Sequence, residues 1–528
     1  MHRRQFLASA STLPLLACQS PSEITGGFTG ITFERGHLLR DTSSYPAPSV
    51  THRTHVLIAG GGVAGLAAAR ALRLKGVEDF ALLELEDSAG GNSRGGAVDG
   101  IACPLGAHYL PVPGDGAPEV QELLEELGLR KRVAGRWEYE ERHLCHSPQE
   151  RLFIHGAWQD GLLPVAGVGA DTLAQYQKIA ALVEQLRAQA HWTIPMSNRP
   201  LAQVQRALAA ITFAAWLEQN GLNDSYLRWY LDYCCRDDFG AGAATVSAWA
   251  GIHYFASRHG FHAPGSDSGE RDSVLTWPEG NAWLTRRLAA PLGERLHTGQ
   301  VVVRIAATKQ GVEVDAYNTA THALERWQAR RAIVALPVFI AARVLQNPPD
   351  FLRQAAAATT YAPWLVANIH IEAPLYDRPG PAPSWDNVLY QAPGLGYVDA
   401  MHQSLQPVPG ATVLSYYRAL GDVPDGRRIL LEKPWAQWRD EILDELAAAH
   451  PDIRGKTKRI DITRYGHAMA IPTPALSSQI GLQLTFNLRE QLQKTERITF
   501  AHSDWAGYSV FEEAFTQGHL AGLAGALS

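Results

Sequence analysis

Cysteine and methionine are scarce in this sequence, with five and four residues among 528. Five cysteines at irregular spacing do not define a disulfide framework, and no Cys/His pattern has the spacing of a metal site, so we expect no metal. The net charge is only −6, which argues against nucleic acid as a partner. Beyond the N-terminal segment no apolar run reaches the roughly 18 residues of a membrane-spanning helix.

The composition is that of a globular protein. Hydrophobic residues make up 46% and charged residues 19% of the chain. A chain of 528 residues is too long for one hydrophobic core, so we expect two domains.

A nucleotide-binding pattern lies near the start of the chain. The apolar run 56–59 predicts a strand buried on both faces, and Gly60, Gly62 and Gly65 follow it as G-x-G-x-x-G. The first glycine permits a tight turn, the second lets a diphosphate approach the backbone, and the third lets helix and strand pack closely. An alanine-rich helix is expected over 64–75, with its N-terminus free to bind an anion.

An acidic residue completes this pattern. A second apolar run over 80–83 delivers Glu84, close to the spacing of about 20 residues expected for a carboxylate that binds a ribose. Glu84, Asp87, Gly90 and Gly91 then form E-x-x-D-x-x-G-G. This segment resembles the second fingerprint of FAD-binding proteins of the flavin amine oxidase superfamily.

The resemblance continues over most of the chain, at 100–109, 278–281, 301–305, 332–337 and 500–518. It implies an α/β fold, with a Rossmann-like FAD-binding domain of the glutathione-reductase type interwoven with an α+β substrate domain. It also implies that Asp504 binds the ribityl chain of FAD. The expected FAD contacts are Gly60, Gly62, Val63, Ala64, Gly65, Glu84, Gly91, Asn92, Arg94, Gly106, Ala107, His108, Tyr109, Val302, Asp504, Val510 and Phe511.

The C-terminal motif has its own signal. Ser509 followed by Glu512 fits a capping box at the start of a helix. In the orientation that the resemblance implies, the helix N-terminus points at the flavin and stabilises negative charge on the reduced ring.

Candidate catalytic residues are fewer. Many amine oxidases of the superfamily carry a lysine on the strand that matches 361–370. This strand has none, and Asn368 or Ala367 lies near the place of that lysine. This departure puts ordinary amine oxidation, and oxygen as the electron acceptor, in doubt. His467 and Tyr508 are further candidates, with ordinary core packing as the alternative. The run 236–238, Arg-Asp-Asp, either binds a cationic substrate or forms a structural ion pair.

The N-terminus predicts export. Arg3 and Arg4 precede Phe6 and Leu7, which resembles a twin-arginine signal, and Leu15 to Cys18 resembles a lipobox. We therefore expect a periplasmic protein, with a lipid anchor at Cys18.

These observations predict an exported FAD-dependent oxidoreductase that transfers a hydride from an amine-like or other small organic substrate to flavin N5, with oxygen or another compound as acceptor. A C–C desaturase or protoporphyrinogen-oxidase-like enzyme is one alternative, and a non-catalytic flavin-binding envelope protein is another. The expected limits are 1–18 for the signal and 19–50 for a tether. The FAD-binding domain comprises 51–115, 276–347 and 463–528, and the substrate domain 116–275 and 348–462.

Overall fold

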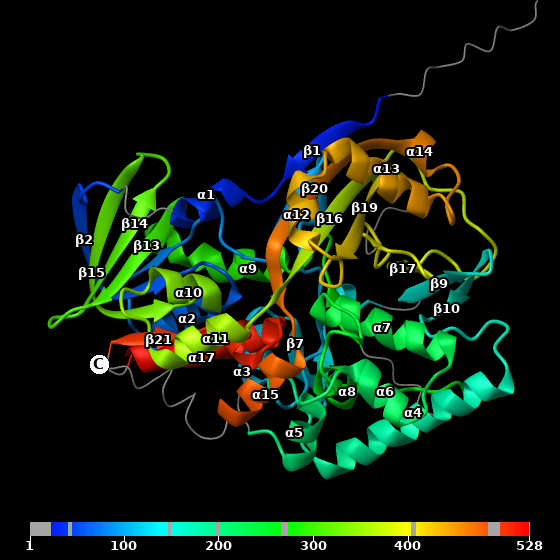
Figure 1. The fold of residues 1–528 in the computed structure, drawn as a ribbon. Helices are drawn as coiled ribbons and strands as arrows, with labels where there is room; N and C mark the ends of the chain where they lie inside the picture. The colour runs from blue at the N-terminus through cyan, green and yellow to red at the C-terminus, as the bar shows by residue number, and fades with distance from the viewer. Residues whose placement is uncertain are drawn as a thin grey trace, which may run out of the picture.

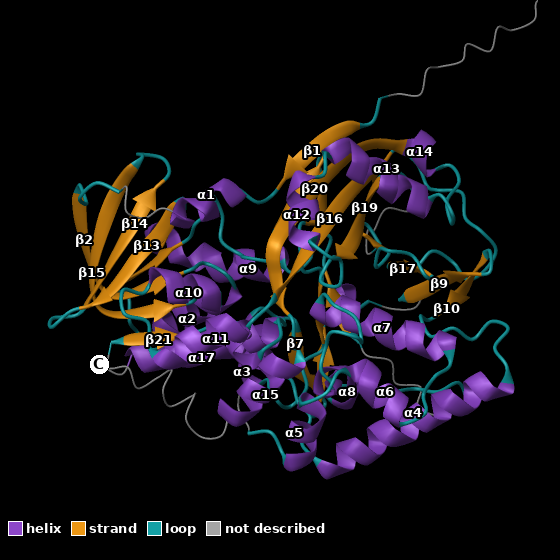
Figure 2. Ribbon diagram, in the orientation of Figure 1, coloured by secondary structure: helices purple, strands orange, loops and turns teal. Residues whose placement is uncertain are grey.

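A computed structural model describes residues 23–40, 45–145, 149–196, 200–265, 273–402, 408–483 and 497–526. The predicted export signal, with Cys18, lies outside the described residues. Two large sheets and a block of helices make up the described fold (Figures 1 and 2).

The first sheet has seven strands and carries the nucleotide-binding pattern. Its order is β12-β3-β2-β15-β14-β13, and β21 pairs with β15. The pairs β12–β3, β3–β2, β2–β15 and β15–β21 are parallel, whereas β13, β14 and β15 form an antiparallel extension. The strands are β2 (Val50–Ala59), β3 (Phe80–Leu83), β12 (Leu296–His297), β13 (Gln300–Ala307), β14 (Val312–Asn318), β15 (Ala323–Val334) and β21 (Ile498–Phe500).

Helices from the N-terminal and C-terminal parts of the chain meet beside this sheet. Helix α2 (Val63–Leu74) is rich in alanine and packs along α17 (Phe511–Ala526). A Cβ added to Gly518 would lie 2.0 Å from the carbonyl oxygen of Ala64, so this close approach requires glycine. Other helices around the sheet are α1 (Phe33–His37), η1 (Leu38–Arg40), α3 (Pro118–Glu126), α9 (Ala282–Ala289), η3 (Ala290–Arg295), α10 (Val338–Val344), α11 (Asp350–Ala358), α15 (Pro474–Gln483) and η4 (Ser503–Ala506).

The second sheet has eight strands in the order β1-β20-β16-β19-β18-β17-β9-β10. Only the β1–β20 and β17–β9 pairs are parallel. Helices α12 to α14 cover one face, where Trp438 and Leu446 are fully buried. The elements are β1 (Thr25–Thr29), β9 (Glu150–Ile154), β10 (Ala157–Asp160), β16 (Tyr361–Ile371), β17 (Asp386–Leu389), β18 (Tyr397–Asp399), β19 (Thr412–Ala419), β20 (Thr457–Ala470), α12 (Gly426–Glu432), α13 (Trp435–Leu446) and α14 (Ile453–Lys456).

A helical block lies below the second sheet in Figure 1. It consists of α4 (Ala170–Gln189), α5 (Gln203–Ala209), α6 (Phe213–Gln219), α7 (Ser225–Phe239) and α8 (Ala248–Ala256). The remaining elements are β4 (Gly95–Val98) with β5 (Ile101–Pro104), β6 (Tyr109–Pro111) with β11 (Val274–Thr276), β7 (Arg130–Val133) with β8 (Arg136–Tyr139), and η2 (Glu141–His143).

The predicted mixed α/β fold is confirmed. The domain limits stay a prediction, although two details bear on them: β1 lies within the segment expected to be a tether, and the expected limit at 462/463 falls inside β20. Within the described ranges, no helix combines the length and apolar character that crossing a bilayer requires. The same part of the chain holds no His, Cys, Asp or Glu cluster suited to a metal ion, and Cys103, Cys145, Cys234 and Cys235 are buried free thiols.

Candidate functional site

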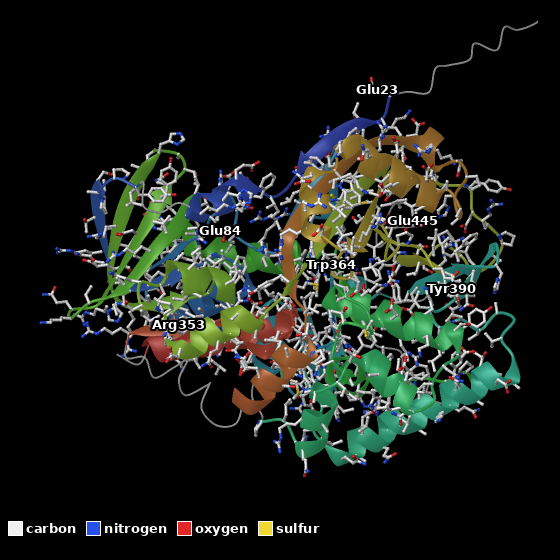
Figure 3. The ribbon with its side chains drawn as sticks, in the orientation of Figure 1. Glu23, Glu84, Arg353, Trp364, Tyr390 and Glu445 are labelled. Carbon is white, nitrogen blue, oxygen red and sulfur yellow. The ribbon has the colours of Figure 1, made fainter. Side chains whose placement is uncertain are left out.

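A cavity of about 470 Å³ reaches from the β2–α2 turn of the first sheet to strands β16, β19 and β20 of the second. Figure 3 labels Glu84 and Trp364, which line it from the two sides. Of the FAD contacts expected from the sequence, the following line the cavity: Gly60, Gly62, Val63, Ala64, Glu84, Gly91, Asn92, Gly106, Ala107, His108, Tyr109, Val302, Asp504, Val510 and Phe511.

The glycine turn forms one end of this cavity. Gly60 has φ +105, and a Cβ there would lie 2.3 Å from the carbonyl oxygen of Ala335. Gly65 does not line the cavity; its Cβ would lie 1.8 Å from the Gly60 carbonyl oxygen, so it serves the close packing of helix and strand. At Gly62 the space is open, because the nearest atom to an added Cβ is the Gly91 Cα at 3.9 Å. Gly62 is also the N-cap of α2 and makes no side-chain cap, so the helix N-terminus is available to a diphosphate.

Glu84 lies beside this turn and is held by backbone amides. Its carboxylate accepts hydrogen bonds from Gly61 N–H at 2.8 Å and Glu86 N–H at 2.9 Å. Burial raises the pKa of Glu84, and these amides and Arg94 oppose the rise. The geometry does not support Arg94 as a phosphate contact, because its guanidinium lies 3.8 Å from Glu84 and 3.9 Å from Glu86 and does not line the cavity.

Asp504 also lines the cavity and has three partners. It accepts hydrogen bonds from Val338 N–H at 3.0 Å and Tyr361 Oη at 2.5 Å, and His502 Nδ1 is 3.1 Å away. Burial alone would raise the pKa of Asp504, but His502 and these hydrogen bonds hold it below its usual value.

Two buried amide oxygens show that the cavity fits a dinucleotide. Gln300 Oε1 and Asn281 Oδ1 have no hydrogen-bond partner among the described residues, although both side chains line the cavity. A buried acceptor without a donor costs free energy, and FAD offers amino and hydroxyl donors. Together with the open backbone at Gly62, these acceptors make the cavity suitable for FAD.

The end of the cavity next to α7 is rich in carboxylates and aromatic rings. Asp237 and Asp238 at the end of α7 line it, together with Glu512 in the first turn of α17. Among the described residues that line the cavity, only Arg258 carries a guanidinium, and its Nη2 lies 3.0 Å from Asp238. Aromatic walls come from His108, Tyr109, Trp364 and Tyr417, and the His108 and Tyr417 rings stack at 4.4 Å.

Two of these carboxylates titrate near neutrality. Burial, together with the charge of Asp238, raises the pKa of Asp237 to about 7. Burial likewise raises the pKa of Glu512 to about 7. Burial lowers the pKa of His108 to about 3, so this ring is neutral. No hydrogen bond or ion pair engages the Asp237 carboxylate within the described part of the chain, which leaves it available to a ligand.

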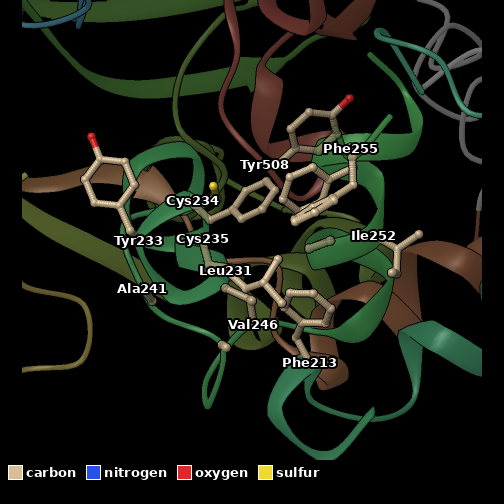
Figure 4. Close-up of a cluster of buried hydrophobic side chains, with 14 of the residues drawn as sticks. Phe213, Leu231, Tyr233, Cys234, Cys235, Ala241, Val246, Ile252, Phe255 and Tyr508 are labelled. Carbon is tan, nitrogen blue, oxygen red and sulfur yellow. The ribbon is translucent and has the colours of Figure 1, made fainter. Parts of the chain in front are cut away.

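Of the three predicted catalytic residues, only His467 lines the cavity. Asn368 does not line the cavity: its amide donates to the Pro104 carbonyl and accepts from Ser415 Oγ, so it bridges neighbouring segments. Tyr508 does not line it either; its hydroxyl donates to Glu513 inside a hydrophobic cluster that also contains Cys234 (Figure 4). His467 does line the cavity and is exposed to solvent, so it marks an opening. Burial and the charge of Arg427 lower the pKa of His467 to about 4.

Several cavity residues were missed by sequence reasoning. Tyr361, Tyr417 and Arg258 come from segments that carry no nucleotide motif, and only the sheet pairing and the helical block bring them together. Gln300 is the first residue of β13 and directly precedes 301–305, where the family resemblance continues, so its position offered a signal.

Comparisons with known proteins agree with this geometry. A family model described as flavin containing amine oxidoreductase matches residues 63–521. Putrescine oxidase bound to putrescine has a similar fold, with a TM-score of 0.66, 19% identity and coverage of 90% of this chain and 99% of that one. Cyclohexylamine oxidase from Brevibacterium oxydans IH-35A gives a TM-score of 0.61 at 19% identity, with 90% and 98% coverage.

One curated relative shows similarity in sequence. An L-amino acid dehydrogenase of Synechocystis is 25% identical over 285 residues, which span 52% of this chain and 53% of that protein. The chain thus matches about half the length of this relative. The family model, by contrast, covers most of the chain, and the cofactor of the enzyme is FAD. The chain belongs to the flavin-containing amine oxidoreductases and is an FAD-dependent oxidoreductase.

Proposed function

We propose that this enzyme oxidises a small cationic amine. The observation that carries the proposal is the carboxylate end of the cavity, where Asp237 and Glu512 accompany Asp238, and Arg258 is already paired with Asp238. Such a surface favours an ammonium group over an anion or a neutral hydrocarbon. The same observation disfavours C–C desaturation, because a substrate without a cation would leave these carboxylates uncompensated.

The chain's own residues have distinct roles in this proposal. The turn at Gly60 and Gly62, with Asp504 and Gln300, would hold FAD, which supplies the hydride acceptor. Tyr109, Trp364 and Tyr417 form an aromatic wall that excludes water and can face a cation. A carboxylate whose pKa is near 7 can take a proton from a bound ammonium, and a neutral amine is the form that releases a hydride.

An L-amino acid is the second candidate substrate. Arg258 is the observation that favours it, because a guanidinium can bind a substrate carboxylate bidentately if Asp238 gives way. The related L-amino acid dehydrogenase is consistent with this candidate.

Localisation and anchoring remain proposals from the sequence. The twin-arginine segment supports export to the periplasm, and Cys18 supports a lipid anchor. Fractionation of cells that express the wild-type chain or Cys18→Ala tests both. The proposal predicts membrane-bound wild-type protein and soluble exported variant.

Anaerobic stopped-flow mixing tests the proposed reaction. The oxidised holoenzyme is mixed with monoamines, diamines, L-amino acids and matched alcohols, and the visible flavin band is followed. The proposal predicts bleaching by amines and none by alcohols of the same skeleton. Bleaching by L-amino acids alone would favour the second candidate, and no bleaching by any of these compounds would refute both.

A further inference from the structure

A second cavity lies on the far side of Tyr361 from the FAD cavity. It has a volume of about 540 Å³ and lies between the start of β16 and helix α12. Tyr361 lines both cavities, so a single aromatic side chain, hydrogen-bonded to Asp504, forms part of the partition. We call the second cavity the α12 groove; the half-buried Val423 and Leu431 contribute apolar surface to it.

The α12 groove contains a cation that no acidic side chain neutralises. Arg427 donates from Nε to the Gly466 carbonyl at 2.7 Å, and its terminal nitrogens have no acceptor among the described residues. The neighbouring Arg428 differs, because Asp425 and Glu432 lie 2.9 and 3.2 Å from its guanidinium. The groove thus offers two free guanidinium nitrogens beside apolar surface, which suits a ligand with an apolar body and an anionic or carbonyl oxygen.

We propose that the α12 groove binds the electron acceptor, a small aromatic compound with a carbonyl or anionic oxygen held by Arg427. The acceptor would lie one side chain away from the FAD cavity. In the step, a quinone-type acceptor gains two electrons and one proton from the reduced cofactor and a second proton from solvent, so that both carbonyls become hydroxyls and the cofactor is oxidised. The proposal rests on the proposed function only for the source of the electrons.

The absence of lysine from the walls of the FAD cavity agrees with a separate acceptor site. None of the described residues that line this cavity is a lysine. The formal charges that line the α12 groove balance, but both of its carboxylates, Asp425 and Glu432, are paired with Arg428, so no ion pair engages Arg427 within the described part of the chain.

Photoreduced holoenzyme provides the test, because photoreduction needs no amine and separates this proposal from the proposed function. The reduced enzyme is mixed anaerobically with naphthoquinone sulfonate or with neutral naphthoquinone, and cofactor reoxidation is followed. The wild type should show saturation with the sulfonate at a concentration about tenfold lower than with the neutral compound, as expected for one charged hydrogen-bonding partner.

Two variants and one control make the test specific. Arg427→Gln should raise the half-saturating sulfonate concentration about tenfold and leave that of the neutral compound nearly unchanged. Val423→Trp, which fills the groove, should slow both acceptors. Arg330→Gln removes an exposed charge from β15, far from the groove, and should change neither.

A binding measurement accompanies the kinetics. Calorimetric titration of the oxidised holoenzyme with naphthoquinone sulfonate should show one site, weakened about tenfold by Arg427→Gln but not by Arg330→Gln. Equal reoxidation and equal binding in wild type, Arg427→Gln and Val423→Trp would overturn the proposal, even if amines reduce the enzyme.

Discussion

Replacement of Asp237 by asparagine should strengthen the fold and weaken the function. The pKa of this carboxyl rises from 3.8 to about 7 on folding, mainly because of burial. The native state therefore binds more protons than the unfolded state between these values, and the stability of the wild type falls as the pH rises through this window. A shift of this size corresponds to roughly 4 kcal/mol above pH 7, as an upper limit.

The expected thermal shift follows from the size of the chain. Unfolding entropy scales with length, so about 1 kcal/mol corresponds to about 1 °C for a chain of this size. Asp237→Asn should thus raise the melting temperature by roughly 2–4 °C at pH 8 and leave it unchanged near pH 4. Differential scanning calorimetry of the holoenzyme measures this shift. Asp115→Asn, which removes an exposed carboxylate, is the control and should show no such pH dependence.

The same variant should lose affinity for cations. A quaternary ammonium ligand keeps its charge at every pH, so the pH dependence of its binding reports on the protein alone. Its dissociation constant, measured from the perturbation of the flavin spectrum, should fall in the wild type as the pH rises through 7. In Asp237→Asn it should be roughly tenfold higher, since a charge-assisted contact is lost, and its pH dependence should be weaker, because only Glu512 still titrates near 7 there. A variant that is not stabilised at pH 8, or that binds the cation as the wild type does, would refute the reasoning.

Three further predictions concern the FAD cavity. Gly62→Ala should fold but bind FAD at least tenfold more weakly, because its Cβ enters the open space beside the turn. Gly65→Ala should fail to fold, because its Cβ would meet the Gly60 carbonyl oxygen. Circular dichroism measures the folding of both variants, and titration with FAD measures the binding. Gln300→Leu should weaken FAD binding about tenfold without destabilising the apo-protein, because the amide oxygen that it removes has no donor among the described residues in the absence of FAD. A lower free energy of unfolding for the apo variant in urea would contradict this. Asp504→Asn should cost roughly 1–3 kcal/mol in urea unfolding at pH 7, and the difference from wild type should close as the pH falls below the usual carboxyl range, because the lowered pKa stabilises the native state only above it.

The sequence predicted the local elements of the FAD-binding half well. The strand expected over 56–59 is the buried end of β2, and the helix expected over 64–75 is α2, shifted by one residue. Apolar periodicity and glycine turns decide these elements locally, so short-range reasoning suffices. The C-terminal helix packs against the same half, since Gly518 lies against Ala64.

Tertiary contacts overturned the expected capping box. Helix α17 begins at Phe511, and Ser509 Oγ instead accepts a hydrogen bond from Ala470 N–H of β20. Glu512, in the first turn of α17, lines the cavity. A partner nearly 40 positions away in sequence cannot be recognised from local spacing.

The substrate end was predictable only in part. The Arg-Asp-Asp run at 236–238 was recognised as either a cation site or a structural pair, and the structure shows elements of both: Asp237 faces the cavity, while Asp238 pairs with Arg258. Asn368 was chosen by alignment with a lysine, but the amide lies within the second sheet, away from the cavity. Asn368 shares a face of β16 with Trp364 and Val366, which line the cavity, but it lies two residues further along the strand, beyond the cavity.

Titration of the apo-protein with FAD tests most directly whether segments from both ends of the chain form one cofactor site. Flavin fluorescence should show one saturable site per chain in the wild type, with strongly weakened binding in Gly62→Ala. A colourless wild-type protein that takes up no FAD, or equal binding by the two proteins, would contradict the account.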